Sequence, residues 1–192
     1  MAADRAILLW LNGLVGQLPW LDRVFALIVN DYFVPTTLAL LLVGLWYSGR
    51  SEAQRERGQR AVADAALGLA FANLALAVLN HFYYRPRPFV EHELKLLFYQ
   101  PPDSSFPSNP AAVGFALAVG VALSHRRLGS VMLALALLWA ASRVYAGVNF
   151  PSDVTAGAAI GALCPLLARG FLRLLEPAPT LMLKLWRHLY LA

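Results

Sequence analysis

The chain has 192 residues, of which 59% are hydrophobic and only 14% charged, and its mean hydropathy is +0.56. A soluble domain of this size carries about a quarter charged residues, so the composition excludes an ordinary soluble enzyme and favours one polytopic membrane domain over residues 1–192. The net charge of +5 is typical of the basic short loops of membrane proteins, and in the absence of a lysine-rich or arginine–aromatic patch we expect no nucleic-acid partner.

The N-terminal segment is apolar but short. Residues 6–16 lack charges, and Pro19 and the pair Asp22 and Arg23 follow closely. We therefore expect residues 1–25 to contain an interfacial helix. Whether this first apolar segment instead spans the membrane stays open, so the expected number of transmembrane helices is five or six.

Five longer apolar segments follow, and a run of about 18 or more apolar residues marks a membrane span. The arginine-rich loop SGRSEAQRERGQR between the first two is expected to lie in water, and the proline-rich connection 83–107 cannot form one continuous helix. The sequence thus predicts an all-α membrane bundle with its transmembrane core at 26–175 and an amphipathic surface helix in the tail 178–192. The five predicted spans cover 26–47, 61–82, 111–124, 131–148 and 154–172.

The arginines of the short loops gather on one side of the predicted bundle, together with the basic residues after the last span. The positive-inside rule makes this side, with the C-terminus, cytoplasmic. The connection 83–107 and the NFPSD turn then face outward. The basic residues that carry this inference are Arg50, Arg55, Arg57, Arg60, Arg126, Arg127, Arg169, Arg173, Lys184 and Arg187.

Unusual polar residues meet on the outward side, in RPRP at 85–88, FPSNP at 106–110 and SR at 142–143, with Asp153 beyond them. Guanidinium groups match phosphate geometry, and SNP is typical of a helix N-terminus, which also attracts anions. We expect Ser108 or Asn109 to be the cap. Spacing alone leaves two interpretations open: a phosphate site, or interfacial arginines paired with Glu91, Glu93, Asp103 or Asp153.

The same three segments resemble, in order and spacing, the motifs of the type-2 phosphatidic acid phosphatase (PAP2) superfamily. These motifs are K-x6-R-P, P-S-G-H and S-R-x5-H-x3-D. The N-terminal LNGLVGQLPWLDRVFALIVND is also similar to bacterial undecaprenyl-diphosphatases of that superfamily, which implies a bacterial plasma membrane. The matching residues are Arg87, Pro88, Pro107, Ser108, Ser142, Arg143 and Asp153; the departures are Asn80 for lysine, Asn109 for glycine, and Pro110 and Asn149 for the two histidines.

These departures remove the chemistry that the resemblance implies. In the family the third-motif histidine attacks phosphorus and the second-motif histidine protonates the leaving group. The amide of Asn149 has no basic lone pair, and Pro110 has neither a titratable group nor an N–H. We therefore expect no catalytic residues. The predicted phosphate-binding residues are Arg87, Ser108, Asn109, Arg143 and Asn149, supported by Arg85 and by Asp153, which pairs with Arg143 or accepts from Asn149.

Three functions follow as hypotheses. The first is a pseudo-phosphatase that binds a polyprenyl or glycerolipid phosphate at its outer face without hydrolysing it. The second is an accessory subunit of a larger membrane complex, with protein partners. The third is an active lipid phosphatase with relocated residues, for which His81 and His92 are the histidines on the correct side. We expect no cofactor and no metal site, because one cysteine, Cys164, and scattered histidines form no ligand pattern.

Overall fold

The computed structural model describes residues 2–188, which form helices and their connections without any strand. The all-helical architecture predicted from the sequence is confirmed. The predicted tail 178–192 is helical up to His188, and its last four residues lie outside the described residues. The helices are α1 Ala2–Gly13, α2 Pro19–Val29, α3 Phe33–Tyr47, α4 Glu52–Phe82, α5 Pro88–Glu91, α6 Asn109–Ala122, α7 Arg126–Tyr145, α8 Pro151–Leu174 and α9 Ala178–His188.

Three of the described helices, α4, α7 and α8, are long and apolar enough to cross a membrane. Helices α2 and α3 together form a fourth such unit, bent by 57° at the polar residues Asn30 and Asp31, and α6 is a shorter apolar helix. In lipid every backbone group must find a partner inside the protein, which makes helices the natural state of these segments. The expectation of five or six spans stays a prediction.

One element boundary differs from the sequence prediction, and the start of α6 agrees with it. The arginine-rich stretch expected as a loop is already helical, since α4 begins at Glu52, where the Ser51 side chain accepts a hydrogen bond of 3.3 Å from the Gln54 N–H. Such a cap, followed by good helix formers, extends a helix beyond its apolar part. At the start of α6, Ser108 occupies the cap position without a side-chain capping bond, and Pro110 is the second helical residue.

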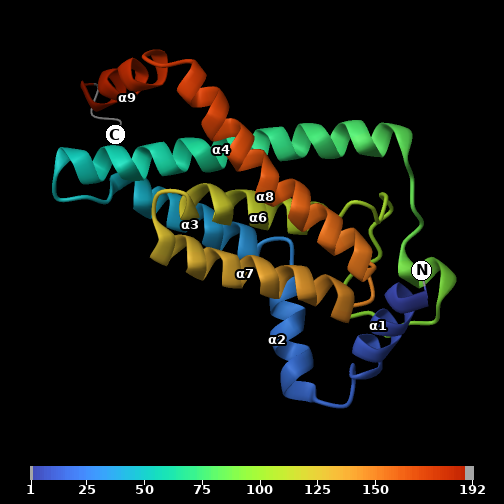
Figure 1. Ribbon diagram of the computed structural model, residues 1–192. Coiled ribbons are helices and arrows are strands. Elements are labelled where there is room, and N and C mark those ends of the chain that lie inside the picture. Colours follow the sequence, from blue (N-terminus) through green and yellow to red (C-terminus); the bar gives the residue numbers. More distant parts are fainter. Residues whose placement is uncertain (1, 189–192) are drawn as a thin grey trace.

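Helix α6 lies at the centre of the bundle, packed against α4, α7 and α8 (Figure 1). Small residues allow this close approach. A Cβ atom on Gly120 would lie 2.4 Å from the Cα of Ala65 in α4, and one on Gly161 would lie 2.3 Å from the carbonyl oxygen of Ala112. Small contact residues of this kind are how membrane helices bring their backbones together.

The outer faces of the bundle are apolar, as a lipid-facing surface requires. Large apolar side chains on α3, α4, α7 and α8 are more than half exposed. Proteins that face water rarely expose so many of them together. Examples are Leu40, Leu74, Leu137, Leu163 and Leu167. Polar side chains gather instead at the ends of the bundle, where α6 and α8 begin and where α7 ends.

Candidate functional site

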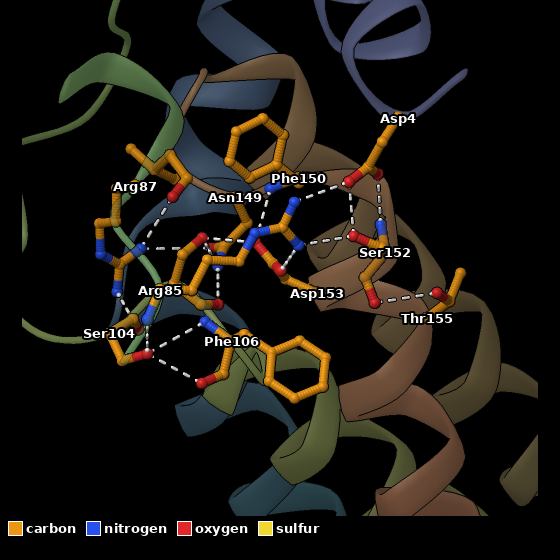
Figure 2. Close-up of polar contacts among 12 residues, drawn as sticks. Asp4, Arg85, Arg87, Ser104, Phe106, Asn149, Phe150, Ser152, Asp153 and Thr155 are labelled. Atoms are coloured by element: carbon orange, nitrogen blue, oxygen red, sulfur yellow. Dashed lines mark hydrogen bonds and ion pairs between the residues drawn. The ribbon is translucent and has the colours of Figure 1, made fainter. Parts of the chain in front are cut away.

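The three motif segments meet at one end of the bundle, which we call the motif end. Arg87 immediately precedes α5, Ser108 caps α6, and Arg143 lies in the last turn of α7. Asn149 follows in the turn to α8, and Asp153 stands in the first turn of α8. Residues from four separate parts of the chain therefore form one polar cluster, of which Figure 2 shows Arg87, Asn149 and Asp153.

Asn149 lies at the middle of this cluster and is almost fully buried. Its Oδ1 accepts hydrogen bonds from Arg87 Nη1 at 3.5 Å and from Arg143 Nε at 3.3 Å. Its Nδ2 donates to the carbonyl oxygen of Ser105 at 2.8 Å. The amide therefore bridges two guanidinium groups with a neutral acceptor.

Arg87 is 5% exposed and is held mainly by backbone oxygens. Its Nη1 donates to the carbonyl of Val148 at 2.9 Å and its Nε to the carbonyl of Asp103 at 3.1 Å. Its ion-pair partner is the Asp103 carboxylate at 2.8 Å, whose side chain is 67% exposed. The guanidinium is thus fixed in place, while its counter-ion lies in a solvent-exposed loop.

Arg143 is similarly placed, being 3% exposed. Its guanidinium lies over the ring of Phe98, 4.6 Å from the centroid, and donates to the carbonyl of Val29 at 3.4 Å. The ion-pair partner is Asp31, at 3.4 Å and itself 39% exposed. Asp31 also accepts from the Tyr99 hydroxyl at 2.9 Å, and this bond raises the pKa of Tyr99.

These two arginines line one pocket of about 360 Å³. Asn109 and Pro110, at the N-terminus of α6, form another part of its wall, and Trp139 contributes a buried indole. Within the described residues the Trp139 Nε1–H has no hydrogen-bond partner, and neither does the nearly buried hydroxyl of Ser108. A buried donor without a partner normally marks a place where a ligand or water completes the bonding.

A second group of side chains adjoins the pocket and is organised by Arg85. Its Nη1 donates to Asp153 Oδ1 at 2.5 Å and to Ser152 Oγ at 2.7 Å, and its Nη2 donates to Asp4 Oδ2 at 2.9 Å (Figure 2). The guanidinium also stacks on the ring of Phe150 at 4.2 Å. Burial raises the pKa of Asp4, but the hydrogen bonds from Ser152 and Arg85 outweigh it and leave that pKa below its usual value.

The partner of Asp153 corrects one sequence prediction. Asp153 was expected to pair with Arg143 or to accept from Asn149, but its described partners are Arg85, the backbone N–H of Phe150 at 2.9 Å, and the Ser105 hydroxyl. The reason is its position in the first turn of α8, where its carboxylate turns back to the helix N-terminus. The interpretation of the arginines as ion-paired was thus partly right: Arg87 pairs with Asp103 and Arg85 with Asp153, as that interpretation allowed, whereas Arg143 pairs with Asp31.

Several predicted residues are not among those that line the pocket, including Ser108 and Asn149 beside it. Asn80 is exposed in the last turn of α4. His81 packs edge-on against Phe82, and His92 lies 6.4 Å from the Phe150 ring. Neither histidine is among the residues that line the pocket. Within the described residues no group of three or more metal-ligating side chains is found.

Sequence reasoning missed several residues of the site. Asp31 and Trp139 line the pocket, Asp4 and Ser152 hold Arg85, and Ser105 binds Asn149. Only Asp31 gave a signal, because it interrupts an otherwise apolar segment. In the sequence, Trp139, Asp4, Ser152 and Ser105 look like ordinary interfacial or core residues. Only the packing of the helices brings them into the site.

Comparison with known proteins agrees with this geometry. Residues 61–174 match the PAP2 superfamily. The chain is 32% identical over 160 residues to the "Putative undecaprenyl-diphosphatase YbjG" of Escherichia coli (strain K12), covering 83% of this chain and 77% of that protein. It is 26% identical over 180 residues to the undecaprenyl-diphosphatase BcrC of Bacillus subtilis (strain 168), covering 92% and 88%.

Two crystal structures have the same fold. Aquifex aeolicus LpxE superposes with a TM-score of 0.65 at 27% identity, covering 88% of this chain and 95% of that one. The first transmembrane PAP2 type phosphatidylglycerolphosphate phosphatase from Bacillus subtilis superposes with a TM-score of 0.63 at 23% identity, covering 92% and 87%. From the motif spacing, the matched region and these relatives, the chain belongs to the PAP2 superfamily of membrane lipid phosphatases.

Proposed function

We propose that this protein binds the phosphate group of a membrane lipid in the motif-end pocket and does not hydrolyse it. The observation that carries the proposal is Asn149. At the family's nucleophile position it has no lone pair able to attack phosphorus, and its oxygen and nitrogen are both engaged by neighbours. Pro110 likewise replaces an acid whose help is worth about 10²–10⁴-fold.

Anion binding does not need those two histidines. Arg87 and Arg143 are buried, converge on one amide oxygen, and line the same pocket. A buried guanidinium is costly without an anionic partner, and phosphate oxygens satisfy guanidinium donors well. The present partners, Asp103 and Asp31, are exposed carboxylates that a phosphate can displace into solvent. Asn109, at the α6 N-terminus, lies on the same wall, where helix N–H groups favour anions.

The relatives suggest the lipid class. YbjG and BcrC are named for undecaprenyl diphosphate, an isoprenoid with an anionic head. The apolar outer faces of the bundle suit such a lipid, since its tail stays in the bilayer while its head enters the pocket. We therefore propose a polyprenyl phosphate or diphosphate as the ligand.

Lipid-phosphate binding is tested by calorimetry. The affinity of the purified protein in detergent is measured with farnesyl diphosphate as the probe. Asn149→Asp keeps the side-chain shape and places a permanent negative charge between the two arginines. We expect binding about tenfold weaker than in the wild type, or about 1.4 kcal/mol, because the new carboxylate neutralises the two arginines and repels the phosphate. Asn80→Asp, the same change at an exposed position, is the matched control. Equal affinity in wild type and Asn149→Asp contradicts the proposed site.

The hydrolysis half is tested by phosphate release from undecaprenyl diphosphate. We expect none above background from the wild type. The double variant Pro110→His and Asn149→His is assayed beside it to learn whether the scaffold is otherwise competent. Phosphate release by the wild-type protein, lost in Arg143→Ala, refutes the non-hydrolytic function while leaving the pocket as the binding site.

A further inference from the structure

A second pocket lies at the other end of the bundle, between α4, α8 and α9. Its volume is about 770 Å³. Helix α9 crosses beside the N-terminal half of α4 and the end of α8 (Figure 1). Measured along α8, this groove is about 30 Å from Asp153, given a rise of about 1.5 Å per residue. It is therefore separate from the motif-end pocket.

The walls of the groove are apolar. Trp46 at the end of α3 and Trp186 in α9 face each other with ring centroids 5.6 Å apart. Leu67 of α4, Leu172 of α8 and Leu183 of α9 line the space between them. Indole rings are favoured at the level of lipid headgroups, and the aliphatic side chains match an alkyl chain.

Three arginines line the same groove, and two of them have partners. Arg60 binds Glu176 at 2.7 Å and the Thr180 hydroxyl at 2.7 Å, which ties α4 to α9. Arg169 binds Asp64 at 2.9 Å and the carbonyl of Leu123 at 3.0 Å. Both arginines serve to hold helices together, so their charges are already compensated.

Arg173 is different. It lines the groove, is exposed, and makes no hydrogen bond or ion pair with any residue between 2 and 188. Glu56 and Glu176 pair with Arg60, and Asp64 pairs with Arg169, so among the three arginines of the groove Arg173 is the one without a carboxylate in contact within residues 2–188; Asp64 acts on it only at longer range. A guanidinium above an apolar slot at the end of a membrane bundle complements a lipid with a negative headgroup, and basic pockets between membrane helices bind such headgroups.

We propose that this groove binds one anionic phospholipid, with the headgroup phosphate on Arg173 and the first part of an acyl chain between α4, α8 and α9. Trp46 and Trp186 close the groove on the side of α3 and α9. A zwitterionic lipid has the same chains but lacks the net negative charge. Selectivity for the anionic headgroup is therefore the signature of this site.

The test is native mass spectrometry of the full chain in detergent, with dioleoyl phosphatidylglycerol and dioleoyl phosphatidylcholine added separately. We expect one phosphatidylglycerol to be retained in clear preference to phosphatidylcholine. Arg173→Gln is expected to reduce retention about fivefold, which corresponds to roughly 1 kcal/mol. Ala66→Trp, which fills the groove and leaves every charge in place, is expected to reduce it as well. Arg127→Gln is the control, an equal charge change on an exposed residue at the same end outside the groove.

Three results overturn the proposal. Equal losses in Arg173→Gln and Arg127→Gln mean a general attraction to the basic end of the bundle, without a site. Equal retention of the two lipids by the wild type means that the groove does not select an anion. A loss in Asn149→Asp but not in Arg173→Gln assigns the bound lipid to the motif-end pocket and also refutes this site.

Discussion

At the residue scale, the motif end is defined by how two buried arginines are neutralised. Arg87 and Arg143 share the oxygen of Asn149, and each is paired with one carboxylate that reaches in from an exposed position. In each pair the guanidinium is buried, whereas the carboxylate lies partly in water, which competes for it. The two aspartates are therefore weak occupants of positions that a phosphate fills more strongly.

This competition predicts that removing a carboxylate strengthens anion binding. In Asp103→Asn, Arg87 loses its counter-ion but keeps its backbone acceptors, so farnesyl diphosphate is expected to bind roughly three- to tenfold more tightly, about 1 kcal/mol. Calorimetry at low and high salt measures the effect, which salt should reduce. Glu93→Gln removes the same charge from the same connection outside the pocket. Weaker binding in Asp103→Asn would contradict displacement of this carboxylate by the ligand.

At the element scale, the first helix completes the site by docking on the start of α8. Asp4 Oδ1 accepts from the Ser152 N–H at 2.8 Å, Oδ2 accepts from the Ser152 hydroxyl at 2.6 Å, and Arg85 supplies an ion pair. The free N–H groups at a helix N-terminus favour such a carboxylate. The side chain of Asp4 in α1 therefore caps α8. These two helices lie far apart in the sequence.

Asp4→Ala should therefore destabilise the fold in a pH-dependent way. Its pKa is lowered in the folded protein, so its contribution is present above the unfolded value of 3.8 and is lost as pH falls through the lower folded value. At pH 7 we expect a loss of about 2 kcal/mol. The difference in thermal unfolding between wild type and variant in detergent should be smaller at pH 3, which lies below the unfolded value, than at pH 7.

The neighbouring exposed residue gives the control for this experiment. Arg5→Ala changes the same helix without touching Ser152 or Arg85, and its unfolding temperature should stay close to that of the wild type at both pH values. A constant difference between Asp4→Ala and wild type across the whole pH range would show that packing of α1, and not the charge of Asp4, stabilises the contact.

At the scale of the whole molecule, the bundle has two chemically different ends. The motif end combines buried arginines with carboxylates, whereas the other end carries the arginines of the short connections and the groove beside α9. The basic residues of short loops determine orientation during insertion. We therefore propose that the motif end faces the extracytoplasmic side and that α9 is cytoplasmic.

Labelling with a membrane-impermeant maleimide tests this orientation in whole cells. Cys164 is buried, so the native chain provides the unlabelled background. Glu93→Cys, in the connection at the motif end, should react in intact cells, whereas Ala53→Cys, at the start of α4, should react only after the membrane is opened. Both positions are exposed. The reverse pattern would invert the proposed topology and place the phosphate pocket in the cytoplasm.

The sequence by itself was sufficient for the helical membrane architecture and for the family. Hydropathy is a local property, and the backbone groups of a segment in lipid need partners that a helix provides. Apolar segments of the sequence therefore predict membrane helices directly. The sequence prediction was wrong where local signals compete. Residues 52–60 are charged and were expected as a loop, but a cap and good helix formers make them the first part of α4. The motif spacing likewise identified Arg87, Arg143 and Asn149, because a family constrains those positions along the chain.

Only the tertiary structure decided which charges meet. The pairing of Asp153 with Arg85, the capping of α8 by Asp4, and the bridging of two arginines by Asn149 join segments far apart in the sequence. Such contacts depend on how the small residues of α4, α6 and α8 set the distances between helices, and no local pattern encodes that. The same is true of the groove under α9, since only the packed helices show that Arg173, unlike Arg60 and Arg169, makes no hydrogen bond or salt bridge within residues 2–188.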